Sequence, residues 1–389
     1  MHLLFATSIV PDGALGSGYE IANAAIIDGL RRAGVRVTVI GFTWPGRAPA
    51  DPANTIVLGE LDVRTDAAPT SRKVRWLAAA MLSGLPVASA KLRVMSADAL
   101  RALIRGAGPF DGYVLNAAPF AGAFDGVFDD LPAVLVAHNV EYRSAEENAA
   151  AAQGFQRVVY TREARALKDM EAKLCAKARF VFTLAEEDRV ALGVASDDRS
   201  AVLPLVTRPK PPALAGRTIA CDAALIGTWT WQPNRIGLDW FLGSVVPHLP
   251  PAFSIRIAGH MPADVTSTHP GVAFVGRVPD AEQFVRTAAV VPLISQAGTG
   301  VQLKTIETFE LGLPSVATRR SLRGIDFLPP NCVVEDDPKA FAAALVAAAR
   351  ERRPAIDGAV FHRRQLKALD AAILRGLKVF REARAEAAA

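Results

Sequence analysis

The sequence predicts an α/β protein built from two Rossmann-like, doubly wound domains that face each other across a cleft. Short apolar runs alternate with helical apolar patterns along the chain, as expected for parallel strands joined by helices. A proline-rich stretch at 204–217, poor in large apolar residues, separates two such series. At about 150 residues per domain, a chain of 389 residues also fits two domains.

The first series opens with a βαβ unit. Residues 2–8 form an apolar run, a loop with three glycines follows, and residues 19–33 have the apolar spacing of a helix. Gly34 ends this helix, and the next strand is expected at 35–42. Further elements expected in this half are strands at 113–116, 133–137 and 179–184 and a long helix at 162–178.

The second series repeats the same pattern after the proline-rich stretch. Its expected elements are strands at 223–227, 254–258, 272–275, 290–294 and 315–318 and helices at 234–246 and 300–311. The stretch 361–386 is predicted to be a helix, because Leu366, Leu369, Ile373 and Leu377 are spaced for one buried face. In open parallel sheets ligands bind beyond the carboxyl ends of the strands, so the cleft between the domains is the expected site.

Composition excludes several classes of protein. The chain is 51% hydrophobic and 21% charged, which is too apolar for a disordered protein, and a formal charge of +5 is too weak to argue for nucleic acid. Cys175, Cys221 and Cys332 form no CxxC pair, and the six histidines have no metal-ligand spacing, so no metal is expected. With no signal-like leader and no long apolar run, a cytoplasmic location is expected. The abundance of Ala, Arg and Pro suggests a GC-rich bacterial genome.

Four segments carry a family resemblance. Three lie in the second half, namely LIGTWTWQPNRIGLDWF (225–241), IAGHMP followed by VAFVGRVPD (272–280), and SQAGTGVQLKTIETFELGLPSVATRRSLRG (295–324). The fourth, AHNVEYR (137–143), is similar to an HNxE segment at the domain cleft. Together they resemble the retaining GT-B glycosyltransferases of the group 1 (family 4) type. The resemblance implies an acceptor-binding domain at 1–205, a nucleotide-sugar-binding domain at 206–360, and a C-terminal helix at 361–389 that packs back toward the first domain.

The strongest candidate site comprises Gly298, Thr299, Gly300, Lys304 and Glu307. Glycines let the backbone approach a phosphate at a helix N-terminus, where free N–H groups favour anions. A lysine in that helix can reach a diphosphate, and a carboxylate three residues further on can accept both ribose hydroxyls. The alternative is a solvated Lys–Glu pair with i, i+3 spacing.

The chain departs from the family pattern at two donor-binding positions. Relatives carry another glutamate eight positions before Glu307, where this chain has Thr299, and that glutamate usually touches the sugar hydroxyls. The donor sugar is therefore left open. The loop after Gly227 lacks the lysine with which some relatives clamp the diphosphate, and Arg235 is the candidate replacement.

Four further residues border the candidate donor site. The resemblance implies that Arg277 lies near the base or the diphosphate and that Val278 holds the base edge through its backbone; an exposed surface arginine is the alternative. Trp229 and Trp231 either shape the site or pack in the core.

In the first half, His138 follows an apolar strand at the end where ligands collect. The resemblance implies that it faces the transferred sugar, and a core histidine bonded to backbone is the alternative. Glu141 follows in the same segment and is a candidate for acceptor binding. Gly16 and Gly18, in the loop after the first strand, are candidates for the same role, although the loop only approaches the GxGxxG pattern.

Residues 72–105 hold seven basic residues and one acid, interleaved with apolar ones. This segment is either a peripheral contact with the inner face of a membrane, a pocket for an anionic or lipid-diphosphate acceptor, or a solvated helix face.

The resemblance implies a retaining, metal-independent hexosyltransferase of polysaccharide biosynthesis, with no cofactor. It would move a sugar from a nucleoside-diphosphate sugar to a glycan, lipid-linked or other hydroxyl acceptor. A nucleotide-sugar epimerase of the same architecture and a non-catalytic sugar-binding protein are the alternatives. Catalysis would rest on His138 and Lys304.

Overall fold

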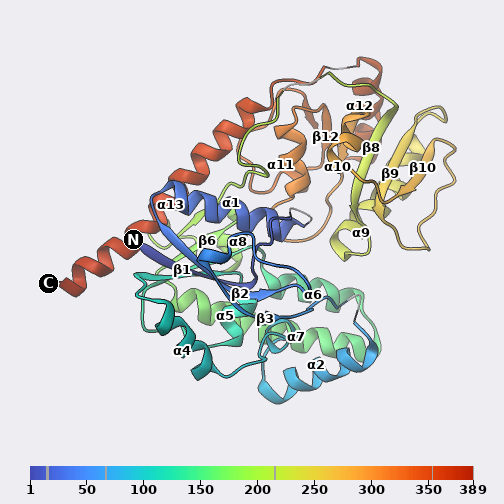
Figure 1. Cartoon of the computed structure of the whole chain (residues 1–389). Helices are drawn as coiled ribbons and strands as arrows, with labels where there is room; N and C mark the ends of the chain where they lie inside the picture. Colours follow the sequence, from blue (N-terminus) through green and yellow to red (C-terminus); the bar gives the residue numbers. More distant parts are fainter. Residues whose placement is uncertain (15–16, 66–67, 214–215, 353, 389) are drawn as a thin grey trace. The chain divides into compact units, whose positions relative to one another are not determined.

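The structure is a computed structural model that describes residues 1–14, 17–65, 68–213, 216–352 and 354–388. The chain divides into two compact units, which are described separately (Figure 1). The first unit comprises Met1–Leu205 and Lys367–Ala389, and the second comprises Val206–Leu366. Each unit is built on one parallel β-sheet, as the sequence predicts.

The first unit has a seven-stranded sheet with the order β3-β2-β1-β4-β5-β6-β7, and all its paired strands are parallel. In chain order the strands are β1 (His2–Ile9), β2 (Arg36–Thr43), β3 (Thr55–Glu60), β4 (Gly112–Asn116), β5 (Ala133–Ala137), β6 (Phe180–Thr183) and β7 (Ser200–Val202). Parallel pairing brings their carboxyl ends to one edge of the sheet.

The helices of the first unit cover both faces of its sheet. They are α1 (Gly18–Arg32), η1 (Pro52–Asn54), α2 (Thr70–Ser83), α3 (Val87–Ala90), α4 (Ala97–Ala107), α5 (Ala118–Ala123), α6 (Glu141–Ala151), α7 (Gly154–Lys177), α8 (Glu186–Ala191) and most of α13 (Ala359–Ala388).

Alternate side chains of the central strands of this sheet pack against different helices, since successive residues of a strand point to opposite faces. Leu115 and Leu135 share a core with Phe120 of α5 and Leu167 of α7. Their neighbours Val114, Val134 and Val136 instead line a crevice with side chains of α1 and α13.

The second unit has a six-stranded parallel sheet with the order β10-β9-β8-β11-β12-β13. Its strands are β8 (Cys221–Thr228), β9 (Ile255–His260), β10 (Val272–Gly276), β11 (Ala288–Leu293), β12 (Ser315–Ala317) and β13 (Cys332–Val334). Its helices are α9 (Gln232–Trp240), which continues into the short turns η2 (Phe241–Val245) and η3 (Val246–His248), then α10 (Ala281–Arg286), α11 (Leu303–Glu310), η4 (Arg319–Leu322) and α12 (Pro338–Arg350). Phe241 and Phe341 anchor the core between β8, β9 and the helices α9 and α12.

The predicted elements correspond closely to the observed ones, with one difference at the candidate site. The helix expected at 300–311 begins only at Leu303. Gly300 has a φ of +71°, a left-handed conformation that no right-handed helix contains, so it belongs to the preceding loop. Lys304 is therefore in the first turn of the helix.

Candidate functional site

The glycine loop between β11 and α11 has a fixed and unusual backbone. Gly298 and Gly300 both have positive φ, at +94° and +71°. A Cβ added at Gly298 would lie 3.1 Å from Cβ of Pro233 in α9, a tight contact that adds to the conformational preference for glycine at this position. The carbonyl of Gly298 accepts hydrogen bonds from the guanidinium groups of Arg320 and Arg323, in and just after η4. Sequence reasoning missed these two arginines, which hold the loop in place.

Lys304 projects from the first turn of α11 beside this loop. Its Nζ donates to Oδ1 of Asn234 at 3.2 Å and lies 5.3 Å from the centre of the Trp229 ring. Burial lowers the pKa of Lys304 to about 8. Within the described residues no ion pair joins Lys304 to Glu307, which argues against a solvated Lys–Glu pair. The arrangement is an ammonium group at a helix N-terminus, and both features attract anions.

Glu307 lies one turn further along α11 and is partly exposed. Its carboxylate is 3.6 Å from Nη2 of Arg208, whose guanidinium also contacts Glu282 and Glu310. Burial raises the pKa of Glu307, and the nearby Arg208 counteracts that shift. Glu310 is fully buried and accepts hydrogen bonds from the backbone and hydroxyl of Thr207, which is a structural role. Glu307 thus remains the acidic side chain on α11 with room to accept hydroxyls.

The candidates around β8 are engaged in packing or in ion pairs. The space above Gly227 is filled by the indole of Trp229, since an added Cβ would lie 3.2 Å from that ring. Trp229 is itself buried and donates from Nε1 to the carbonyl of Ala258, so it is a core residue that also forms a platform under Lys304. Arg235 is held by Asp239 and by a two-bond contact with Asp264. Lys304 is therefore the better candidate for a diphosphate partner.

The candidates after β10 lie at the edge of the sheet. Arg277 is exposed and reaches His260 Nδ1 at 3.5 Å, while Val278 is half-buried. Trp231, just before α9, is 49% exposed, in contrast with Trp229. Thr299, the residue in place of the family glutamate, is buried within the glycine loop.

In the first unit, His138 belongs to a buried polar network at the carboxyl ends of β1, β4 and β5. Its Nε2 contacts Oδ1 of Asn116, the last residue of β4, at 2.8 Å. The Asn116 amide group donates to Oδ1 of Asn23 at 2.7 Å and to Oγ1 of Thr7 at 3.1 Å. This orientation of Asn116 assigns the His138 proton to Nε2 and leaves Nδ1 as an acceptor. Burial lowers the pKa of His138 to about 4, so the ring is neutral at physiological pH.

The backbone beside this network is strained. Ala117, directly after Asn116, has a φ of +65° although it is not glycine. Such a conformation costs about 1–3 kcal/mol and persists at positions that the surroundings fix. Its N–H donates to the carbonyl of Val136 at 2.9 Å, which ties the end of β4 to β5. The sequence signal that could have revealed Asn116 is the polar residue that ends the apolar run YVLN.

Glu141 is the first residue of α6. The buried carboxylate of Glu171 binds the backbone at this end of the helix. The N–H groups of Glu141 and Tyr142 donate to the two oxygens of Glu171 at 2.9 and 3.0 Å. Burial raises the pKa of Glu171 to about 7. Gly18 is the exposed first residue of α1, whose N-cap is Ser17. Gly16 lies outside the described residues.

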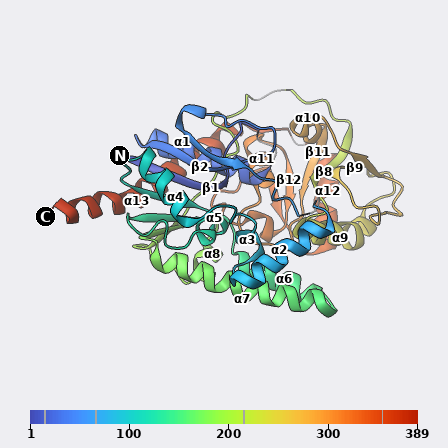
Figure 2. The ribbon, with the colours of Figure 1, turned by 60° about the horizontal axis from the view of Figure 1, so that its bottom comes forward.

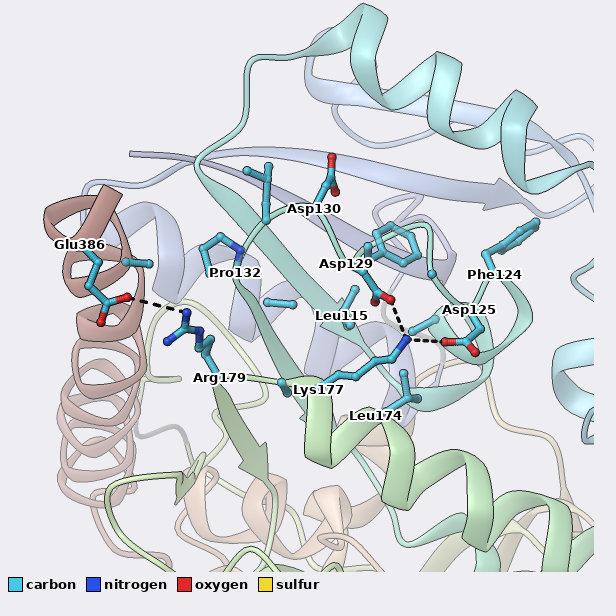
Figure 3. A pocket seen from close by; sticks show the side chains of 17 residues that line it. Leu115, Phe124, Asp125, Asp129, Asp130, Pro132, Leu174, Lys177, Arg179 and Glu386 are labelled. Atoms are coloured by element: carbon cyan, nitrogen blue, oxygen red, sulfur yellow. Dashed lines mark hydrogen bonds and ion pairs between the residues drawn. The ribbon is translucent and has the colours of Figure 1, made fainter. Parts of the chain in front are cut away.

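A larger pocket of about 570 Å³ lies away from these groups (Figure 3). It is at the starts of β5 and β6, where Lys177 bridges Asp125 and Asp129. Its two described cations, Lys177 and Arg179, are both paired with carboxylates, which leaves neither free for a phosphate. In the part of the chain that the structure describes, no cluster of three or more His, Cys, Asp or Glu residues could hold a metal ion. Nor is any described helix both long and apolar enough to cross a membrane.

Residues 222–351 match the family model of Glycosyl transferases group 1. They form a group 1 glycosyltransferase domain. This domain contains the glycine loop, Lys304 and Glu307. The search of curated protein sequences found no match.

Solved structures extend the likeness over the whole chain. Sucrose-phosphate synthase from Thermosynechococcus elongatus aligns with a TM-score of 0.62 at 15% identity, over 100% of both chains. The apo form of the lipopolysaccharide outer core galactosyltransferase WaaB aligns with a TM-score of 0.57 at 11% identity, over 96% of this chain and 99% of that one. HepE from Anabaena, solved in complex with UDP, aligns with a TM-score of 0.52 at 12% identity, over 99% of this chain and 100% of that one. The glycosyltransferase domain is thus part of a chain with the GT-B fold.

Proposed function

We propose that the chain is a retaining glycosyltransferase that transfers a sugar from a nucleoside-diphosphate sugar to a hydroxyl group of a glycan, lipid-linked or other acceptor. The observation that carries this proposal is Lys304 at the start of α11, beside a glycine loop of fixed backbone and within the group 1 match. In this proposal residues 206–360 bind the donor and residues 1–205 bind the acceptor.

The diphosphate of the donor would bind at the N-terminus of α11. Free N–H groups at a helix start and the ammonium group of Lys304 provide positive charge without a metal ion. The UDP bound to HepE, a protein of the same fold, supports a nucleoside diphosphate as the ligand. Glu307, one turn along the helix, would accept the ribose hydroxyls, and Val278 would hold the base edge.

In the transfer step the bond between the anomeric carbon and the diphosphate oxygen breaks, and the acceptor oxygen bonds to the same face of the sugar. The acceptor proton passes to the leaving diphosphate. Negative charge grows on that diphosphate as the bond breaks, so the fixed charge of Lys304 stabilises the transition state more than the bound donor. No protein nucleophile is needed.

His138 would contact the transferred sugar as a neutral ring. Its Nε2–H is committed to Asn116, so the group available to a sugar hydroxyl is the acceptor Nδ1. Glu141 and Gly18, at the starts of α6 and α1, remain candidates for acceptor binding. Three buried, unoxidised cysteines fit a cytoplasmic enzyme.

The proposal is tested by incubating the protein with a panel of nucleotide sugars and measuring release of the nucleoside diphosphate. The assay is run with and without glycan and lipid-linked acceptors. We expect release that depends on an acceptor, with the anomeric configuration of the donor kept in the product. Conversion of the nucleotide sugar without any acceptor would instead identify an epimerase, and binding without turnover across the panel would identify a sugar-binding protein.

A further inference from the structure

Helix α2 presents an apolar stripe to solvent. Of its residues 70–83, only Ala80 is buried. Val74, Met81 and Leu82 are 60%, 48% and 91% exposed, and Ala78 between them is exposed as well. These positions follow the i, i+4, i+7, i+8 spacing of one helix face. The stripe thus lies on the solvent side of α2. The opposite side of the helix, which includes Ala80, packs against the first unit.

The surroundings of this stripe are positively charged. Helix α2 contains Arg72, Lys73 and Arg75 and has no acidic residue. The start of α7 lies beside it, because Nη2 of Arg162 donates to the carbonyl of Ala80 at 2.7 Å (Figure 2).

The start of α7 repeats the same combination of side chains. Phe155 and Val158, three residues apart, are 73% and 63% exposed, and Arg157 between them is exposed too. Residues 70–83 and 154–162 together contain five cations and no acid. We call these two segments the α2–α7 face.

Two of the four remaining basic residues of 72–105 are engaged elsewhere in the unit. Lys91 is buried and donates to the carbonyl of Val63, and its Nζ lies 4.5 Å from the Trp76 ring. Arg101 pairs with Asp98 and reaches the carbonyl of Gly126. The α2–α7 face therefore does not include Lys91 or Arg101, and it includes a part of α7 that lies outside 72–105.

We propose that the α2–α7 face docks on an anionic lipid bilayer. An exposed helix with an apolar stripe and cationic neighbours lies in the plane of a membrane interface, with its apolar side chains among the acyl chains and its cations at the head groups. Charge favours this occupant over a second copy of the chain, because two copies would bring Arg72, Lys73, Arg75 and Arg157 against the same four cations; Arg162 is paired with Glu163. Binding to lipid requires no sugar transfer, so a lipid-binding experiment tests this proposal independently of the proposed enzymatic activity.

The test is cosedimentation of the full-length protein with phosphatidylcholine vesicles that do or do not contain phosphatidylglycerol. We expect binding to the anionic vesicles only, weakened by added salt. Each cation near an anionic surface contributes about fivefold in partitioning, so the triple variant Arg72→Gln, Lys73→Gln, Arg75→Gln should bind on the order of a hundredfold more weakly. The apolar variant Val74→Ser, Met81→Ser, Leu82→Ser should lose more than about tenfold.

Helix α13 provides matched controls, since Lys367, Lys378 and Arg381 are exposed and Leu374 is 47% exposed. Changing those three cations to Gln, or Leu374 to Ser, should leave binding unchanged. Equal losses in the α13 and α2 variants would overturn the proposal, as would equal binding of the wild type to both kinds of vesicle or to neither. A wild-type dimer that the apolar variant converts to a monomer would also overturn it, because a second copy would then cover the face.

A second measurement avoids disruptive variants. A Leu82→Cys variant labelled with a polarity-sensitive dye should show a blue-shifted emission on anionic vesicles, and a labelled Leu374→Cys variant should not. The three native cysteines are buried, so labelling is selective for the new thiol. An unshifted spectrum at Leu82 while the protein sediments with the vesicles would show that another surface binds the lipid.

Discussion

Two ionisable side chains, the partly buried Lys304 and the buried His138, carry the proposed chemistry, and burial acts on both in the same direction. It lowers the pKa of Lys304 to about 8 and that of His138 to about 4. The consequences differ because a lysine with a pKa of about 8 is still charged at neutral pH, whereas the histidine is neutral. One group is suited to an anion and the other to a sugar hydroxyl.

The first prediction concerns the pH dependence of diphosphate binding. A bound anion favours protonated Lys304, so affinity should be greatest below about pH 8 and fall by up to tenfold per pH unit above it. The Lys304→Arg variant should bind with nearly constant affinity over the same range, because a guanidinium stays protonated. Calorimetry with a nucleoside diphosphate in buffers of different ionisation enthalpy measures both the affinity and the proton uptake. A wild-type affinity that does not change across pH 8 would contradict the role of Lys304.

The second prediction concerns His138, which we expect to act on turnover more than on nucleotide binding. His138→Ala should lower the turnover number and leave the dissociation constant of the nucleoside diphosphate nearly unchanged. The folded pKa lies below the unfolded value of about 6.5, so wild-type stability should decline as pH falls from about 6.5 toward 4, by up to about 1.4 kcal/mol per pH unit.

This decline should be weaker in the His138→Ala variant, since alanine takes up no proton. Urea unfolding at several pH values follows it. Wild-type turnover in a folded His138→Ala protein would make this residue purely structural.

At the scale of elements, the glycine loop before α11 determines where the site can form. The left-handed Gly300 delays the start of α11, and the two arginine contacts hold the Gly298 carbonyl. The periodicity of apolar residues predicts that a helix is present here, but it does not determine the residue at which the helix begins. The late start of α11 therefore could not be predicted from the sequence.

Three of the strands that the sequence pattern missed share a position in the fold. Strands β3, β7 and β13 lie at the edges of their sheets. Edge strands are paired on one side only, and β3 is half-buried or exposed along its length.

The third prediction tests this loop through Gly298→Ala, with Gly34→Ala as its control. Both glycines have positive φ, but an added Cβ meets Pro233 at 3.1 Å in the first case and nothing within 4 Å in the second. Both variants should lose about 1 kcal/mol or more of unfolding free energy through backbone strain. Gly298→Ala should also weaken nucleoside-diphosphate binding, because α9 and the loop must move apart. Equal affinities in the two variants, measured by calorimetry, would show that the loop does not shape the site.

At the scale of the whole molecule, the sequence predicts two units with parallel sheets, and it shows the family resemblance of the second unit. The network of Thr7, Asn23, Asn116 and His138 could not be predicted, because it depends on the adjacency of β1, β4 and β5 in space. The engagement of Arg235 by Asp264 was hidden for the same reason, since Asp264 lies 29 residues away, whereas its pairing with Asp239 has the i, i+4 spacing of one helix.

The central claim is that the glycosyltransferase domain binds a nucleoside diphosphate along α11, and the most direct test is calorimetric titration of Glu307→Ala. Loss of charged hydrogen bonds to the ribose, worth roughly 1.5–3 kcal/mol, should weaken binding by about ten- to a hundredfold. The control is Glu351→Ala, which removes an exposed acid at the end of α12 in the same unit and should bind as the wild type does. An unchanged dissociation constant in a folded Glu307→Ala protein would contradict the account.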